Sequence, residues 1–298
     1  MPPSTPRLLD RPVFVIGCNR SGTTLLYRTL GDHPVMWSNY EELPDVFWSF
    51  SPIHPERGER IEDPPSGEEA VRLEEALWNE AHNRELLRDS AVLKGLPPSF
   101  FRKRLNFLYK RAPVRFVEKT PANSLRVPFL AAAFPDARFI YLVRRPEAVI
   151  SSLMEGWKFW TKETNPDGSW RFARWHYLAP PGWREKRDRP LPEICAFQWV
   201  EANRLARQDL EACCPDRYVT VRHEELLAAP SKSYAMLREF CELPPSPFFQ
   251  SRVASLDERV YTHRLSKPRP EKWKDLHEEE VESVRPVFEP LARELYPE

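Results

Sequence analysis

Long apolar runs and a secretion signal are missing from this chain. Its 298 residues have a mean hydropathy of -0.58, and no apolar run approaches the roughly 20 residues that cross a bilayer. The first residues lack the pattern of a signal peptide. We therefore expect a cytoplasmic protein with no membrane span.

Cysteine is scarce, and its spacing indicates no pairing. The five cysteines are odd in number, and none of them lies in a Cys-x-x-Cys or another metal-ligand spacing. This pattern argues against a disulfide framework and against a structural metal site. We expect reduced thiols at Cys18, Cys195, Cys213, Cys214 and Cys241.

Net charge is also lacking, since 44 Lys and Arg residues balance 44 Asp and Glu residues. A balanced chain is unsuited to general binding of polyanions, and we therefore expect no nucleic-acid partner. The cations are unevenly placed, with eleven Lys or Arg against two Asp or Glu between residues 99 and 145. This local excess suits a small, highly charged ligand.

Glycine is rare, yet two of the nine glycines lie in the run GCNRSGTT at residues 17–24. The β-branched run Val13–Ile16 before it predicts a buried parallel strand, and the apolar spacing of residues 24–30 predicts a helix. Glycine permits a sharp turn and a close approach of N–H groups to an anion, and the helix N-terminus adds positive charge. The pattern predicts an anion site at this turn.

This loop has the length of a nucleotide triphosphatase P-loop but lacks its lysine. In that motif the lysine precedes the final Ser or Thr and reaches the β- and γ-phosphates. Here Thr23 stands in that position, and the nearby cation is Arg20, which suits a forked grip on phosphate or sulfate. A P-loop small-molecule kinase that uses ATP is an alternative, although no later strand clearly ends in an apolar-apolar-Asp metal signature.

A second anion element follows another apolar run. Residues 137–143 predict a buried strand, and Arg144 follows it directly. Pro146 fits the first turn of a helix, and Ser152 lies about two turns farther on. Because open α/β sheets bind ligands at the carboxyl ends of their strands, Arg144 is expected near the first loop.

Together these runs resemble the sulfotransferases that use 3′-phosphoadenosine 5′-phosphosulfate (PAPS). Residues 17–24 resemble their 5′-phosphosulfate loop, and Arg-x-Pro with a serine eight residues after the arginine resembles their 3′-phosphate element. The segment Glu118-Lys119-Thr120-Pro121 and residues 134–139 resemble a further stretch of the bacterial and carbohydrate-type branch. The resemblance covers residues 11 to about 152 with clear motifs, and the rest more loosely.

The resemblance implies which residues bind the cofactor. It assigns the 3′-phosphate to Arg144 and Ser152. It assigns the 5′-phosphosulfate to the loop residues Arg20, Ser21, Gly22, Thr23 and Thr24. Residues 267–274 resemble a C-terminal cofactor loop without its glycines, in which Lys267, Arg269 or Lys274 would cover the 3′-phosphate. A solvated charge cluster is the alternative for this last segment.

The implied fold is α/β, a P-loop-type three-layer fold with a central, mainly parallel sheet flanked by helices. We expect a single sulfotransferase domain over residues 1–298, with helical or loop insertions at about 50–110 and 157–192. The implied activity moves a sulfuryl group from PAPS to a hydroxyl, or an amine, of a small-molecule or carbohydrate acceptor, and releases adenosine 3′,5′-bisphosphate. No metal is required in principle, because a sulfate ester carries less charge than a phosphate chain. A non-catalytic nucleotide-binding relative is a further alternative, and oligomeric state and acceptor identity stay open.

Sulfuryl transfer needs a base for the acceptor and positive charge over the leaving oxygen. Glu41 and Glu42 precede an aromatic run that resembles the stretch supplying the catalytic glutamate of carbohydrate-type sulfotransferases, and the alignment favours Glu42. His33 is a rival base, ranked lower because it precedes a proline in an expected turn. Lys119 is the candidate to polarise the leaving oxygen, together with Arg20 and the loop amides.

Other patterns predict the surroundings of the site. Ser66 and Glu69 have capping-box spacing and predict a helix. Residues 157–192 are rich in Trp and Pro without a period, which predicts a long loop or lid and a candidate wall of the acceptor site. A helix is expected from Pro192, and a strand at residues 217–222. The helix has a core stripe formed by Cys195, Trp199, Ala202, Ala206 and Leu210.

Overall fold

The computed structural model describes residues 7–38, 42–51, 53–82, 115–164, 175–256 and 271–297. Within these ranges the chain forms a five-stranded sheet in the order β2-β3-β1-β4-β5, and every neighbouring pair is parallel. The strands are β1 (Val13–Ile16), β2 (Met36–Trp37), β3 (Arg115–Glu118), β4 (Arg138–Val143) and β5 (Tyr218–Arg222). The predicted α/β fold with a parallel central sheet is confirmed.

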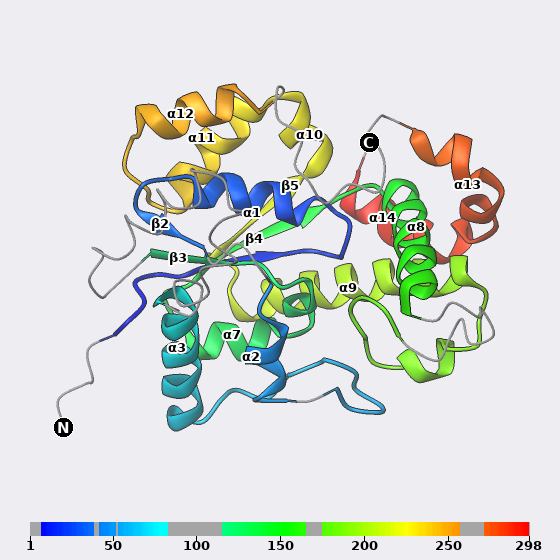
Figure 1. Cartoon of the computed structure of the whole chain (residues 1–298), viewed down its shortest axis with the longest axis horizontal. Helices are drawn as coiled ribbons and strands as arrows, with labels where there is room; N and C mark the ends of the chain where they lie inside the picture. Colours follow the sequence, from blue (N-terminus) through cyan, green and yellow to red (C-terminus); the bar gives the residue numbers. More distant parts are fainter. Residues whose placement is uncertain are drawn as a thin grey trace.

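Helices cover both faces of this sheet (Figure 1). One face carries α1 (Thr23–Gly31), α10 (His223–Ala228), α11 (Pro230–Phe240) and α12 (Pro247–Ala254). The other face carries α2 (Pro44–Trp48), α3 (Gly67–His82), α7 (Val127–Ala133) and α9 (Leu191–Cys213). Beside α9 lie α8 (Pro146–Thr164), α13 (Lys272–Ser283) and α14 (Arg285–Leu295). Two 3-10 turns, η1 (Pro121–Leu125) and η2 (Trp183–Lys186), complete the described elements.

The side-chain alternation of β1 explains the two layers. Val13 and Val15 pack into the core under α1, whereas Phe14 and Ile16 pack into the core under α7 and α9. All four are fully buried, because successive strand residues point to opposite faces and both faces are covered. The chain therefore builds two cores on one central strand.

The long helix predicted from Pro192 begins at Leu191, with Pro192 in its first turn. Its predicted stripe is confirmed as core, since every member is fully buried: Cys195, Trp199, Ala202, Ala206 and Leu210. All five cysteines of the chain are free thiols. No helix in the described ranges combines the length and apolar character that a membrane span needs.

The predicted capping box is also confirmed. The Ser66 backbone N–H donates to Glu69 Oε2 at 2.8 Å, and the Glu69 N–H donates to Ser66 Oγ at 3.2 Å. The helix that follows, α3, buries Leu73 and Leu77 in the core beside α7 and α2.

The loop predicted for residues 157–192 is wrong over its first part, because α8 continues to Thr164. Trp157 is the physical reason. Its ring is buried, and its Nε1–H donates to Gln198 Oε1 on α9 at 3.1 Å, so the helix is held where the sequence pattern loses its period. Residues 175–182 are irregular as expected, and residues 165–174 lie outside the described ranges.

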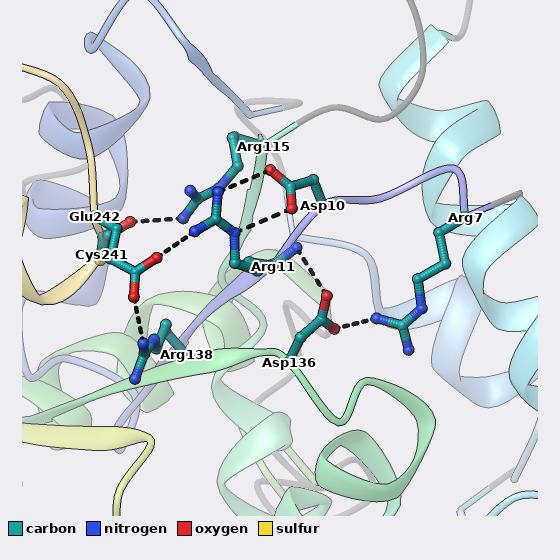
Figure 2. A network of polar contacts seen from close by, with 8 residues as sticks. All are labelled: Arg7, Asp10, Arg11, Arg115, Asp136, Arg138, Cys241 and Glu242. Atoms are coloured by element: carbon teal, nitrogen blue, oxygen red, sulfur yellow. Dashed lines mark hydrogen bonds and ion pairs between the residues drawn. The ribbon is translucent and has the colours of Figure 1, made fainter.

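A charged network clamps the amino ends of the strands (Figure 2). Arg138, the first residue of β4, donates to Glu242 Oε1 at 2.6 Å. Arg115, the first residue of β3, donates to the Cys241 carbonyl at 2.6 Å, and Arg11, just before β1, also contacts Glu242. Three strands are thereby tied to the chain that follows α11, at the edge of the sheet opposite to the loop at residues 17–24.

A buried ion pair joins the loop before α3 to α9. Arg60 Nη2 donates to Asp209 Oδ1 at 2.9 Å with both groups buried, and the same guanidinium donates to the exposed Glu62 at 3.2 Å. Removing one partner of a buried pair leaves a desolvated charge.

We predict that Asp209→Ala lowers the free energy of unfolding in urea by about 3 kcal/mol. Glu62→Ala on the same guanidinium is the control and should cost less than about 1 kcal/mol; equal losses would contradict the prediction.

Candidate active site

The loop after β1 is folded as a tight anion-type turn. The Gly17 N–H donates to Ser124 Oγ at 3.0 Å, and a Cβ at Gly17 would lie 2.6 Å from the Leu142 carbonyl oxygen. The Ser21 N–H closes the turn onto the Cys18 carbonyl at 3.2 Å. Glycine at position 17 is therefore required by the close approach of β4.

Gly22 has a second steric role at the start of α1. Its φ of 94° lies in the left-handed region, and a Cβ there would lie 2.4 Å from Cδ2 of His223. His223 begins α10 directly after β5. Burial lowers the pKa of the imidazole to about 3, and the charge of Arg144 acts in the same direction. The neutral imidazole of His223 therefore packs against the loop at Gly22.

The two predicted anion elements meet in space. Arg20 Nε donates to Ser152 Oγ at 3.0 Å, and Arg144 Nη1 donates to the Arg20 carbonyl at 2.9 Å. The Trp199 indole N–H in turn donates to the Arg144 carbonyl at 3.1 Å. Residues more than 120 positions apart in the sequence thus form one cationic corner at the carboxyl ends of β1 and β4.

This corner fits an oxyanion ligand. Ser21 Oγ is buried and has no hydrogen-bond partner among the described residues, and α1 has no acidic residue in its first turn. Burial lowers the pKa of the Arg144 guanidinium, with Arg20 acting in the same direction and Glu224 opposing. Because an anion would supply the opposite charge, the site has donors and cations suited to phosphate or sulfate.

The predicted base and the predicted polarising cation form an ion pair. Lys119 follows β3 and is 4% exposed, and its ammonium contacts Glu42 Oε1; the Glu42 side chain is 45% exposed. The Leu43 N–H donates to Thr120 Oγ1 at 2.9 Å, which holds the turn that carries Glu42. Glu41 lies outside the described residues, and so do Lys267 and Arg269.

His33 lies far from this edge of the sheet. It follows α1, whose nine residues rise about 13 Å away from the loop. Its ring is buried, with Nε2 2.9 Å from the Pro244 carbonyl and an edge contact to Phe249. This geometry favours Glu42 over His33 as the base.

A buried carboxylate stands behind the Lys119–Glu42 pair. Glu118 is 1% exposed, and it accepts hydrogen bonds from Thr120 Oγ1 and, at 2.6 Å, from Asn123 Nδ2. Burial raises the pKa of Glu118 to about 7, against the opposing effects of these hydrogen bonds and of the Lys119 charge. The group therefore changes charge near neutral pH inside the protein.

This raised pKa predicts a pH-dependent stability. The folded state binds more protons than the unfolded state between pH 4.5 and about 7, so Glu118 contributes stability below this window and loses it as pH rises. The full difference is about 3 kcal/mol. We expect the stability of the wild type minus that of Glu118→Gln to fall from pH 4.5 to 7.5 in urea unfolding. A pH-independent difference would contradict the raised pKa.

Sequence patterns alone missed three supporting residues. His223 directly follows the strand predicted at residues 217–222, but a single histidine after a strand does not indicate a contact to Gly22. Trp199 lies in the predicted core stripe of α9. The helical period predicts its burial but not the hydrogen bond from its indole N–H to the Arg144 carbonyl. Ser124 lies in η1, where no pattern indicated a contact to the loop.

Metal ligands are not gathered in the described parts of the chain. Over those ranges no group of three or more His, Cys, Asp or Glu side chains is placed to hold a metal ion.

Comparison with known proteins gives one family and one fold. Residues 12–247 match the sulfotransferase family. The omega-hydroxy-beta-dihydromenaquinone-9 sulfotransferase Stf3 of Mycobacterium tuberculosis is 24% identical over 265 residues, which cover 75% of this chain and 60% of that protein. An uncharacterized protein of Aquifex aeolicus is 27% identical over 238 residues, which cover 78% of this chain and 26% of that protein. The chain thus spans less than two thirds of the length of these relatives.

Solved structures agree on the fold. Sulfotransferase STF9 from Mycobacterium avium superposes with a TM-score of 0.53 at 17% identity, covering 97% of this chain and 77% of that one. The sulfotransferase domain of the Synechococcus PCC 7002 olefin synthase gives a TM-score of 0.50 at 18% identity, covering 97% of each chain. At these identities the likeness is one of fold.

Proposed function

The chain belongs to the sulfotransferase family, and on that premise we propose that it transfers a sulfuryl group from PAPS to a hydroxyl, or less readily an amine, of a small-molecule acceptor. The observation that carries the proposal is the cationic corner of Arg20, Arg144 and Ser152. A nucleotide with separate charges at its 5′ and 3′ positions needs two such anion elements side by side. ATP has no 3′-phosphate for the second element to hold.

Donor binding is assigned to the loop and to the start of α8. When bound, PAPS supplies the sulfuryl group and leaves as adenosine 3′,5′-bisphosphate. The amides of residues 21–24 and Arg20 would hold the 5′ end, and the buried Ser21 hydroxyl would gain a partner there. Arg144 and Ser152 would hold the 3′-phosphate. Lys267 and Arg269 stay predictions of the sequence.

Acceptor activation is assigned to the pair that follows β3. The Glu42 carboxylate would take the proton of the acceptor hydroxyl as the oxygen attacks. The Lys119 ammonium has three N–H donors, so it can hold Glu42 and direct another N–H toward the oxygen that leaves. Its burial reduces competition from water for these contacts.

We propose a single domain over residues 1–298, supported by the two continuous cores that the central strand joins. A hydroxylated small molecule is the proposed acceptor class, in keeping with the name of the mycobacterial relative. The cytoplasmic location and a reaction without metal are predictions of the sequence. An ATP-dependent kinase and a non-catalytic relative are the alternatives.

The 3′-phosphate assignment predicts an affinity loss at one of two adjacent arginines. Arg144 lies in the cationic corner, whereas the exposed Arg145 stacks on Tyr296. We expect Arg144→Ala to weaken binding of adenosine 3′,5′-bisphosphate by about 10- to 100-fold in calorimetry, because charge-assisted hydrogen bonds are lost. Arg145→Ala is the matched control and should stay within about threefold. Equal affinities for the two variants would contradict the assignment.

The base assignment predicts a loss of turnover without a loss of affinity. Glu42→Gln removes the proton acceptor but keeps the size of the side chain, so kcat should fall by about 10²- to 10⁴-fold in transfer of labelled sulfate from PAPS. Affinity for adenosine 3′,5′-bisphosphate should stay within about twofold. The exposed Glu56→Gln is the matched control. Full turnover of Glu42→Gln would overturn the base assignment, whereas magnesium-dependent ATP turnover by the wild type would overturn the proposed function.

A further inference from the structure

The helix next to Glu42 is too short to hold its own geometry. α2 spans five residues, Pro44–Trp48. Its N-cap residue is Leu43, whose side chain provides no capping hydrogen bond. A single helical turn is unstable in isolation, because nucleation fixes several residues for one hydrogen bond. Glu42 lies two residues before this turn and has a half-exposed side chain. The direction of its carboxylate therefore depends on contacts from elsewhere.

The first anchor of α2 runs to the end of β3. The Leu43 N–H donates to Thr120 Oγ1 at 2.9 Å, and the Thr120 hydroxyl in turn donates a hydrogen bond to Glu118 Oε1. The second oxygen of Glu118 accepts from Asn123 Nδ2 at 2.6 Å. Thr120, Glu118 and Asn123 are all buried, so these bonds form where water does not compete.

The same network reaches the other end of α2. Asn123 Oδ1 accepts from Arg126 Nη1 at 3.2 Å, and Arg126 Nη2 donates to Glu59 Oε1 at 3.1 Å. That carboxylate oxygen also accepts the Trp48 indole N–H at 3.1 Å, and Trp48 is the last residue of α2. The Arg126 guanidinium lies 5.2 Å from the centroid of the Phe47 ring. One continuous set of buried polar groups thus fixes α2 at both ends.

The network also extends to the loop after β1, at residues 17–24. Glu59 Oε2 accepts the Ala179 N–H at 2.9 Å, and the neighbouring Leu178 N–H donates to Asn19 Oδ1 at 3.2 Å. Asn19 belongs to the loop that carries Arg20. Glu59 therefore links the segment that carries Glu42 to the loop assigned to the donor, through the backbone of residues 178–179.

We propose that Thr120 and Glu118 are positioning residues for Glu42, and the proposal rests on the function proposed above. They touch no reacting group themselves. They act through the Leu43 amide, which fixes the turn and hence the place of the carboxylate relative to Lys119. Proton transfer depends steeply on such placement, because a displacement of about 1 Å can cost on the order of 10² in rate.

Thr120→Val tests the proposal, because valine keeps the shape but removes the hydroxyl that links Leu43 to Glu118. We expect kcat to fall by about 10- to 100-fold while KM for PAPS and affinity for adenosine 3′,5′-bisphosphate stay within about twofold. Thr120→Ser keeps the hydroxyl and should stay within about threefold of the wild type. Thr220→Val on the exposed face of β5 is the matched control and should leave kcat unchanged.

A double-mutant cycle separates positioning from a general loss of structure. In the Glu42→Gln background Thr120→Val should cause no further loss of kcat, because the group that it positions is already gone. An equal loss in both backgrounds would mean that Thr120 acts on the fold as a whole, and it would overturn the proposal. Normal turnover of Thr120→Val together with slow turnover of Glu42→Gln would overturn the positioning role but leave the base assignment standing. Normal turnover of Glu42→Gln would overturn both the base assignment and the positioning role.

A readout without catalysis completes the test. Amide hydrogen exchange followed by mass spectrometry should be at least about tenfold faster over residues 42–48 in Thr120→Val than in the wild type, Thr120→Ser or Thr220→Val. Unchanged exchange over residues 42–48 would overturn the proposal even if the rate of transfer falls. If this exchange responds but the wild type transfers no sulfate, the hydrogen-bond anchor stands, whereas the proposed function and the positioning role in it fail.

Discussion

The parallel pairing of β1 with both β3 and β4 is the constraint on which the site depends. It brings three carboxyl ends to one edge, so that the loop after β1, Lys119 after β3 and Arg144 after β4 become neighbours. These segments are far apart in the sequence, and no helix or single loop could gather them. The sheet therefore decides which charges meet, and the loops decide only how they are aimed.

Charge is distributed along the strands in opposite ways at their two ends. At the amino ends two of the cations, Arg11 and Arg138, contact the carboxylate of Glu242. At the carboxyl ends Arg20 and Arg144 instead donate to a hydroxyl and a backbone carbonyl, which bear no net charge. Lys119 at the carboxyl end of β3 is paired with Glu42, whereas Arg20 and Arg144 keep positive charge available for an anion.

Most of the fold follows from patterns that are local in the sequence. The apolar runs of β1 and β4, the capping box at Ser66 and the stripe of α9 each predict an element that the structure contains. The prediction that the helix ends before residue 157 was wrong, because Trp157 is held by a hydrogen bond to α9. Sequence periodicity carries no information on such tertiary contacts. The sequence predicted that Arg20, Arg144 and Ser152 lie near one another, but it did not predict the contacts that support this corner. His223 and the Glu118 network owe their roles to packing between distant segments.

The contact between Gly22 and the His223 ring has a consequence for how this corner can change over time. A Cβ at position 22 would lie 2.4 Å from the imidazole, closer than two unbonded carbons approach. A larger residue at position 22 would therefore require a smaller or displaced one at position 223. Because the φ of position 22 is also positive, a smaller side chain at position 223 alone would not remove the backbone strain. The two constraints together confine position 22 to glycine, although the residue that it contacts lies about 200 residues farther along the chain.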